Sequence, residues 1–229
     1  MCVTAYEFIV PVEQVAVIIV WSDGRGHPVK VIAIATLLAA TAVVAEDGFV
    51  PLFNGNDLGG WDTDTPGIWQ ARAGMIVGKS PGLKYNDFLR TRKSYSDFVL
   101  KLSFRLIDGK GNSGIQFRSK AVPNSHEVSG YQADIGEKYW GCLYDESRRN
   151  KVLAQASPES LRGLKHDGWN EYTITARGNH ITLELNGVRT VDYRESGSGI
   201  DSSGFIALQV HSGPPIEVQF KDLRVRELK

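Results

Sequence analysis

The sequence predicts an all-β protein in which two antiparallel sheets pack face to face as a sandwich. Beyond Glu46, short runs rich in β-branched and aromatic residues alternate with Gly, Asn, Asp and Ser, and turn signals recur about every 8–12 residues. Long segments with the 3.6-residue apolar period of a helix are absent from this part of the sequence. Because a half-buried sheet needs a second layer over its apolar face, these observations favour a sandwich.

The front of the chain differs from the rest. Val31–Ala45 is an uncharged apolar run of about 15 residues that follows Lys30 and ends in small residues, which is the pattern of a secretory signal. We therefore expect a leader over residues 1–45, with cleavage before Glu46, and one β-sandwich domain over residues 46–229. The alternative is an uncleaved anchor to which Val15–Trp21 contributes, although a bilayer span takes roughly 20 apolar residues.

Signal peptides begin close to the start of translation, whereas about 28 residues precede this one. We therefore expect the natural start near Val29, since valine is how an alternative GTG start codon reads inside a longer frame. Met1–Pro28 would then lie outside the natural protein. These expectations make the mature protein secreted or periplasmic, with no membrane contact after cleavage.

Composition narrows the range of partners. The 26 lysines and arginines balance the 26 aspartates and glutamates, so no net field favours nucleic acid or an anionic membrane surface. A small neutral ligand fits this balance, and the sequence leaves protein partners open. Cys142 is the one cysteine beyond the leader, which rules out an intrachain disulfide there.

The strands can be placed by alternation and by turn dipeptides. Phe98, Leu100, Leu102, Phe104 and Leu106 predict one apolar face in the longest segment. Trp61, Trp69 and Trp169 lie among apolar strand residues and are predicted to be core. A short helix is expected over Ser157–Leu164, where a serine and a proline resemble a cap and a first turn. The expected strand segments are Phe49–Phe53, Trp69–Val77 around an Ala73-Gly74 turn, Tyr95–Ile107, Glu171–Ala176, His180–Asn186 and Val218–Leu228.

Three further strands, Ser113–Ser119, Gly130–Ile135 and Gly204–His211, each alternate apolar residues with polar ones. Successive side chains of a strand face opposite sides, so each strand places a polar pair on one face. We expect these pairs to line a common hollow on the sheet. They are Gln116 with Arg118, Gln132 with Asp134, and Gln209 with His211.

These residue types can bind a small ligand and move protons. Asp134 is a candidate general base or metal ligand, or else a surface carboxylate that pairs with Arg118. The forked donors of Arg118 suit the oxygen atoms of a bound molecule. His211 could shuttle a proton at neutral pH, or be structural. Gln116, Gln132 and Gln209 suit hydroxyl groups, since an amide both donates and accepts.

The loop Glu137–Lys151 is the second candidate for the site. Trp140, Tyr139 and Tyr144 could stack on the ring of a ligand, and Asp145 and Glu146 are candidate acids or bases, with Lys151 as an added charge. The alternative is a solvated loop held by aromatic anchors. No His-x-His, HExxH or EF-hand spacing occurs, so the sequence indicates no metal site.

Seven segments occur together and in order: FVPLFNGNDLGGW, SYSDFVLKLSFRL, NSGIQFRS, GYQADIG, DGWNEYTI, ITLELNG and FKDLRVREL. With them the chain resembles the 3-keto-disaccharide hydrolase family, long catalogued as a domain of unknown function, over about Phe49–Leu228. The resemblance implies a concanavalin-like or laminin-G-like jelly roll, export in bacteria, and action on sugars oxidised at C3. Laminin-G-like relatives can hold calcium through scattered carboxylates and carbonyls, so calcium or another divalent ion fits the resemblance.

The implied chemistry starts from a ketone at C3, which acidifies the C2 proton. A base removes that proton, the C1 substituent leaves, and water can add to the enone, so the protein would hydrolyse or eliminate 3-keto-glycosides. Many relatives have Glu where this chain has Gln132. The alternatives are therefore a non-catalytic, lectin-like sugar-binding module and, more remotely, a protein-interaction domain that uses the Glu137–Lys151 loop.

The leader prediction has a direct test. If the signal is cleaved, N-terminal sequencing of the exported protein will begin at Glu46, because the small-residue site ends at Ala45. A mature N-terminus well before Asp47 would contradict both the cleavage site and the domain boundary.

Overall fold

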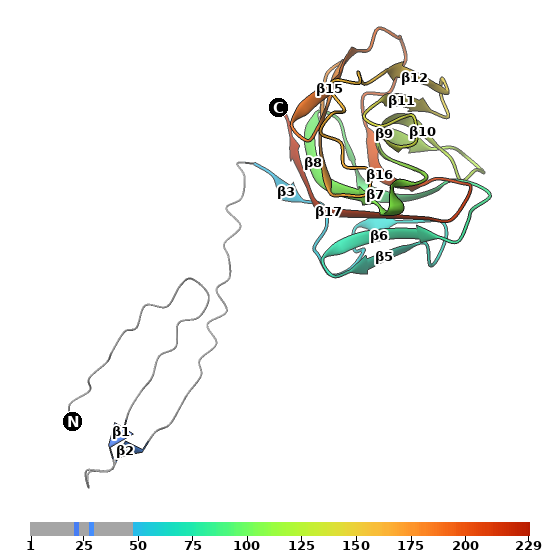
Figure 1. The fold of residues 1–229 in the computed structure, drawn as a ribbon. Coiled ribbons are helices and arrows are strands. Elements are labelled where there is room, and N and C mark those ends of the chain that lie inside the picture. The colour runs from blue at the N-terminus through green and yellow to red at the C-terminus, as the bar shows by residue number, and fades with distance from the viewer. Residues whose placement is uncertain (1–20, 23–27, 30–47) are drawn as a thin grey trace. The chain divides into compact units, whose positions relative to one another are not determined.

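The computed structural model describes residues 21–22, 28–29 and 48–229 and divides the chain into two units, Met1–Val44 and Ala45–Lys229 (Figure 1). In the first unit, β1 (Trp21–Ser22) pairs with β2 (Pro28–Val29) in antiparallel fashion. The signal segment Val31–Ala45 lies outside the described residues. No helix among the described residues has the length and hydropathy to cross a membrane.

The second unit consists of two antiparallel sheets, as the alternation and turn spacing predict (Figure 1). The seven-stranded sheet runs in the order β12 (Lys151–Ala154), β11 (Leu143–Glu146), β10 (Val128–Gly136), β9 (Asn112–Ala121), β16 (Gly204–Val210), β7 (Asp87–Tyr95) and β4 (Trp61–Asp62). The eight-stranded sheet runs β15 (Val188–Arg194), β14 (His180–Leu185), β13 (Asn170–Arg177), β8 (Phe98–Leu106), β17 (Ile216–Glu227), β6 (Met75–Ser80) and β5 (Trp69–Arg72), with β3 (Val50–Pro51) beside β17.

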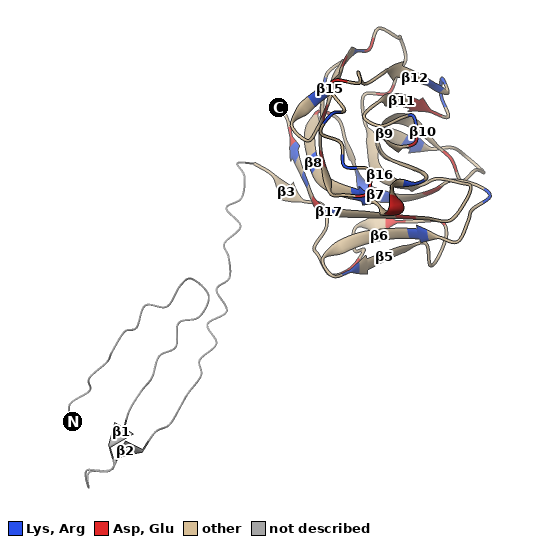
Figure 2. Ribbon diagram, viewed as in Figure 1, with Lys and Arg blue, Asp and Glu red and all other residues tan. Residues whose placement is uncertain are grey.

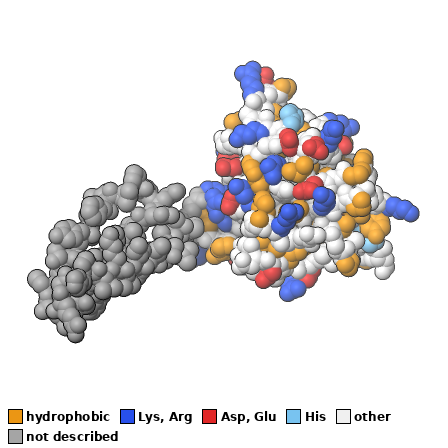
Figure 3. All heavy atoms as spheres, turned by 60° about the horizontal axis from the view of Figure 1, so that its bottom comes forward, with side chains coloured by type: hydrophobic (Ala, Val, Ile, Leu, Met, Phe, Trp, Pro, Cys, Tyr) orange, Lys and Arg blue, Asp and Glu red, His pale blue; other side chains and the backbone are white. Residues whose placement is uncertain are grey.

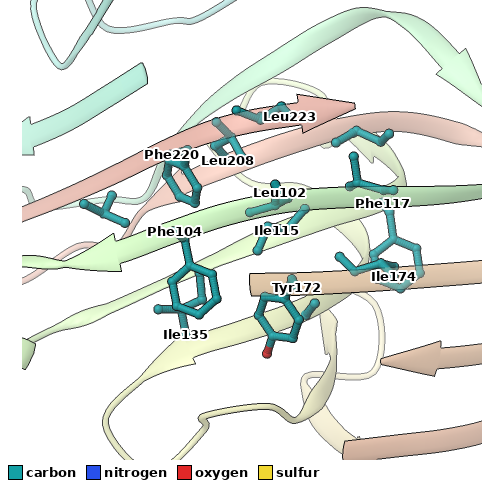
Figure 4. Close-up of a cluster of buried hydrophobic side chains, with 14 of the residues drawn as sticks. Leu102, Phe104, Ile115, Phe117, Ile135, Tyr172, Ile174, Leu208, Phe220 and Leu223 are labelled. Carbon is teal, nitrogen blue, oxygen red and sulfur yellow. The ribbon is translucent and has the colours of Figure 1, made fainter. Parts of the chain in front are cut away.

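The core lies between the sheets, where the inward rows of both interdigitate (Figure 4). In β8 the five alternate residues from Phe98 to Leu106 are buried, as predicted. The ring of Phe104 stacks on that of Tyr172 at 5.2 Å within the eight-stranded sheet, and Phe117 stacks on Tyr131 at 5.6 Å within the other. The edge of Phe98 meets Phe117 at 6.1 Å and joins the two sheets. Full burial of such a side chain stabilises the fold by about 1.5–3 kcal/mol.

The predicted turns form where the dipeptides place them. Ala73 and Gly74 join β5 to β6 with φ of 50° and 74°, and Asn186 and Gly187 join β14 to β15 with φ of 52° and 77°. Positive φ at both central residues gives the turn whose twist matches a two-stranded ribbon. The irregularity expected near the end of the chain is a register shift in β17 at Asp222 (φ 55°).

Two expectations were wrong. Ser157–Leu164 is a succession of turns closed by i→i+3 hydrogen bonds, such as Leu161 N to the Pro158 carbonyl, and not a helix. The cap-like contact of Ser157 does form, because its hydroxyl oxygen accepts a hydrogen bond from Ser160 N at 3.2 Å. Trp169 is not core, because its neighbour Asn170 takes the inward position opposite Phe104 and turns the indole to the outer face of the eight-stranded sheet.

Arg118 marks a sharp bend in β9. Its φ is +48°, and the register of β9 shifts here against both neighbouring strands. The bend brings the backbone of β9 so close to β10 and β16 that a Cβ on Gly130 would lie 2.1 Å from Ser119 Oγ, and one on Gly204 would lie 2.3 Å from the Ser119 carbonyl oxygen. Glycine is thus required on both flanking strands.

Beyond this bend, the tip of the β9–β10 hairpin leans over the outer face of the seven-stranded sheet. Val128 packs with Phe88 and Ala207 in a small cluster separate from the main core. At the tip, the His126 ring stacks on Tyr85 at 3.6 Å. This sheet is therefore covered on both faces, since one side faces the main core and part of the other lies under its own hairpin.

Charged side chains of both signs are spread over the strands of the second unit rather than gathered by sign (Figures 2 and 3). This distribution agrees with the balanced composition of the chain.

The crowding at Gly130 can be tested with a matched glycine. Gly130→Ala should lower the free energy of unfolding by about 1–3 kcal/mol, because the new methyl overlaps Ser119. Gly163→Ala, where nothing lies within 4 Å of the added Cβ, should change it by less than about 0.5 kcal/mol. Equal urea midpoints for the two variants would contradict the close approach of β9 and β10.

Candidate active site on the seven-stranded sheet

A cavity of about 290 Å³ opens on the outer face of the seven-stranded sheet. Side chains from β9, β10, β11, the loop after β10 and the segment after β16 surround it. Its lining residues are Asn112, Gln132, Asp134, Glu137, Lys138, Tyr139, Tyr144, Glu146 and His211.

Strand register explains why these residues meet. Gln132 lies opposite Tyr144 of β11, and Gly130 lies opposite Glu146, so Tyr144 and Glu146 stand on the same outer face as Gln132. Asp134 lies opposite Gly114, which has no side chain to fill the space. A Cβ on Gly114 would lie 2.5 Å from Gln132 Cδ, so glycine is needed for the amide to lie over this strand.

The side chain of Gln132 is fixed by hydrogen bonds to residues of the neighbouring strand β9. Its Oε1 accepts a hydrogen bond from Gln116 Nε2 at 2.9 Å, and Gln116 Oε1 in turn accepts one from Ser119 Oγ at 2.8 Å. Since the oxygen of Gln132 is engaged, its amide nitrogen is the group left to donate, with one hydrogen for Asp134 and a second for the cavity.

Asp134 is the most buried charge-bearing group of the cavity, with 3% of its surface exposed. Burial raises its pKa to about 8, against the opposing hydrogen bonds from Asn112 and Gln132 and with a smaller contribution from the charge of Glu146. The Asn112 Nδ2 donates to Asp134 Oδ1 at 3.2 Å. The backbone is fixed as well, because the Tyr172 hydroxyl crosses the core and donates to the Asp134 carbonyl at 2.7 Å.

Glu146 is the second carboxyl with a raised pKa. Burial brings the pKa to about 7, and the nearby charges of Glu127 and Asp145 add to the shift. Glu127 comes from the leaning hairpin tip, where both of its carboxylate oxygens accept hydrogen bonds from Asn86. The pKa of the Tyr144 phenol is raised too, first by burial and then by the charge of Glu146.

His211 presents a defined ring nitrogen. Its Nδ1 lies 2.7 Å from the Ser212 carbonyl oxygen, which can only accept, so Nδ1 carries the hydrogen. In the neutral imidazole the lone pair is then on Nε2. A ring held in this tautomer, at the margin of a cavity with two carboxyls, can take a proton from a bound molecule.

Three lining residues were missed by sequence reasoning. Asn112 shares a strand face with Gly114 and Gln116, and β9 begins at this residue. A predicted strand that began one residue earlier would have included Asn112 on the polar face. Glu137 and Lys138 fall in the loop that was singled out, but exposed charges in a loop carry no signal of their own. The ammonium of Lys138 lies 5.1 Å from the centre of the Tyr139 ring at the cavity edge.

Arg118 is not part of the cavity, and the expected pairing with Asp134 does not form. The bend in β9 turns its guanidinium away from the face of Gln116. It donates to the carbonyls of Ser96 and Gly178 at 2.8 and 2.7 Å and pairs with Asp97 at 2.8 Å. Because Gly178 belongs to the β13–β14 turn, Arg118 ties the two sheets together.

Asp145 also faces away from the cavity. It is fully buried and pairs with Arg148 at 2.7 Å and with Arg149, which in turn pairs with Glu195. Neighbouring residues of β11 point to opposite faces, so Glu146 reaches the cavity and Asp145 cannot.

The remaining predicted residues lie around the cavity without lining it. Trp140 is core, with its ring 6.4 Å from that of Phe104, and Lys151 is an exposed side chain at the start of β12. Gln116 supports Gln132 as described above. Gln209 is fully buried on the outer face beside Phe88, and its amide nitrogen and oxygen have no hydrogen-bond partner among the described residues.

Among the described residues, no three His, Cys, Asp or Glu side chains are gathered as a metal site. The chemistry that the cavity's side chains support is proton transfer. Two carboxyls that titrate near neutrality and an imidazole nitrogen share one small, partly enclosed space.

The raised pKa of Asp134 makes stability depend on pH. A carboxyl whose pKa is higher in the folded state stabilises the fold while it stays protonated. For Asp134 this stabilisation is lost as pH rises from about 4 to about 8. The free energy of unfolding falls by up to about 1.4 kcal/mol per pH unit in this range. Urea unfolding at pH 5 and pH 8 should show a larger loss for the wild type than for Asp134→Asn, which cannot ionise. The exposed Asp201→Asn should behave as the wild type, and identical pH slopes for all three proteins would contradict the burial of a neutral acid.

The same fold occurs in proteins of known structure. A candidate glycosyl hydrolase from Parabacteroides distasonis is 21% identical, with a TM-score of 0.62 over 80% of this chain and 94% of that one. The carbohydrate binding module CBM66 from Bacillus subtilis is 20% identical, with a TM-score of 0.59 over 73% and 96%. The Bacillus licheniformis beta-glucanase is 10% identical, with a TM-score of 0.54 over 79% and 97%. These similarities show a jelly-roll fold.

A search of curated proteins found no match. The model of the 3-keto-alpha-glucoside-1,2-lyase-like domain matches residues 48–226, nearly the whole second unit. The resemblance carried by the seven sequence segments is thereby confirmed, and the chain belongs to the family of 3-keto-alpha-glucoside-1,2-lyase-like domains.

Proposed function

We propose that this protein is an exported enzyme that cleaves 3-keto-glycosides by removing the proton at C2. The observation that carries the proposal is the meeting of Asp134, Glu146 and His211 in one cavity, with two of the three holding a raised pKa. Family membership supports the substrate class, since the family description names a 3-keto-alpha-glucoside lyase.

His211 is the proposed base. Its Nδ1 is engaged by the Ser212 carbonyl, so Nε2 is the atom that would accept the C2 proton. The electrons of the C2–H bond form the C1–C2 double bond as the bond from C1 to the departing oxygen breaks. After the C2 proton is lost and before the C1–O bond has broken, the ketone at C3 delocalises the negative charge as an enolate.

Asp134 is the proposed acid. With a pKa near 8 it is mostly protonated at neutral pH, which suits donation to the departing oxygen and disfavours the role of base that its strand position alone suggested. The proton lost from C2 and the proton gained by the leaving group balance, and the products are an alcohol and an enone. Addition of water to the enone completes a hydrolysis.

The other lining residues would bind the sugar. The amide nitrogens of Gln132 and Asn112 can donate to hydroxyl or ketone oxygens, and Tyr139 and Tyr144 form an edge-to-face pair at 6.0 Å whose rings offer apolar contact. Glu146, with a pKa near 7, can exchange a proton with the bound sugar or with water. The proposal assigns no step to a metal ion.

A non-catalytic sugar-binding role is the competing proposal. It is favoured by Gln132, whose amide stands on the cavity floor and is tied to Gln116, where a carboxyl could have served as a further acid or base. The two proposals differ in turnover, because a binding module would retain an unoxidised glycan and leave a keto-sugar intact.

Activity on a 3-keto-disaccharide decides between them. Asp134→Asn and His211→Ala should each lower kcat by about 10²–10⁴-fold, as expected for loss of a general acid or base. The exposed Asp201→Asn and the surface His180→Ala, which pairs with Asp192 at 2.7 Å, should retain wild-type rates. Deuterium at C2 of the substrate should slow the wild-type reaction, because that bond breaks.

Circular dichroism would confirm that the variants are folded. Sugar release that is unaffected by deuterium at C2, or by both site substitutions, would overturn the mechanism. Failure of the folded wild type to release any sugar, together with binding of an unoxidised glycan, would favour the binding module.

A further inference from the structure

A second hollow lies on the outer face of the other sheet, on the opposite side of the sandwich from the cavity described above. It has a volume of about 440 Å³, within the range of about 300–1,000 Å³ typical of ligand sites. Trp169 forms one wall, and Ser103, Glu171 and Lys221 lie in the hollow on three adjacent strands.

Register accounts for the hollow. Ser103 of β8 lies directly between Glu171 of β13 and Lys221 of β17, so a small side chain stands between two long ones. Residues that neighbour inward-facing ones must point outward, and Trp169 precedes the buried Asn170. The indole is thus placed beside this gap and away from the core.

The rim of the hollow is held by hydrogen bonds. Asn170 Nδ2 donates to the carbonyls of Lys165 and Gly168 at 2.7 and 3.0 Å, and its Oδ1 accepts from Lys165 N at 2.9 Å. Asn186 Nδ2 donates to the Gly163 carbonyl at 2.9 Å. Two asparagines therefore fix the turn segment that precedes β13, so the wall opposite the sheet is preformed.

Cations mark the open surface of the indole. The Lys221 ammonium lies 4.6 Å and the Arg105 guanidinium 5.1 Å from the centre of the Trp169 ring. Arg105 also donates to Gln219 at 2.8 Å, which fixes it on the sheet. The Lys221 side chain is 38% exposed, and its ammonium lies 3.9 Å from Asp222, so it is held loosely and can swing off the ring.

We propose that this hollow binds a neutral glycan chain, with one sugar ring stacked on Trp169. An indole offers a flat apolar face for the C–H groups of a pyranose, and Ser103, Lys165 and Glu171 supply donors and acceptors for hydroxyl groups. The lining carries Lys165 and Lys221 against Glu171 and Asp222, so charge gives no preference for an acidic sugar. This site does not depend on the activity proposed for the other sheet.

The test is calorimetric titration of the full chain with neutral hexasaccharides of glucose, xylose, mannose and galactose, and with an oligogalacturonate of the same length. At least one neutral hexasaccharide should bind. Trp169→Ala should weaken its binding at least tenfold, and Ser103→Phe, which fills the gap, should do the same. Lys221→Ala, which uncovers the ring, should leave the affinity equal or higher.

Tyr85→Ala is the matched control. Tyr85 is also an exposed aromatic residue, with 39% of its surface accessible, but it stacks on His126 at the seven-stranded sheet and is not part of this hollow. It should bind as the wild type does. The proposal is overturned if no neutral hexasaccharide binds, if binding survives both Trp169→Ala and Ser103→Phe, or if only the oligogalacturonate binds. Loss of hydrolytic activity in Asp134→Asn with retained hexasaccharide binding would separate this site from the other cavity.

Discussion

The bend at Arg118 is the constraint on which the candidate site depends. A guanidinium that would have joined the polar face crosses instead to the turn of the opposite sheet, where it satisfies two carbonyls and one carboxylate. The backbone kink that permits this needs glycine at positions 130 and 204. It also lets the hairpin tip fold back over its own sheet, which brings Glu127 near Glu146 and encloses part of the polar face.

Burial raises the pKa of the two carboxyl groups in the cavity. An aspartate on an open sheet face would be ionised at neutral pH, whereas Asp134, with amide donors as its nearest polar neighbours and almost no contact with solvent, is held neutral. Burial on the outer face of this sheet thus provides a carboxyl that can exchange a proton near neutral pH. The Tyr172 hydroxyl extends this dependence into the core, since it positions the Asp134 backbone from the other sheet.

Sequence alone predicted the sandwich, the hairpin turns and the face of most strands, because alternation and turn dipeptides report on local geometry. It also brought together Gln132, Asp134 and His211, whose places follow from alternation. It failed for Arg118, where a positive φ breaks the period of two, and for Trp169, which precedes β13 and lies next to the inward-facing Asn170. Asp145 was misplaced because loop composition does not reveal which of two adjacent acids joins a strand face.

Gln209 has a consequence for protein engineering. A buried amide whose two polar atoms lack partners within the described part of the chain lowers the free energy of unfolding. An apolar residue of similar size, such as leucine or methionine, would remove the two unpaired polar atoms without adding side-chain volume to the interior. Position 209 is therefore a place where substitution can raise the thermal stability of this scaffold.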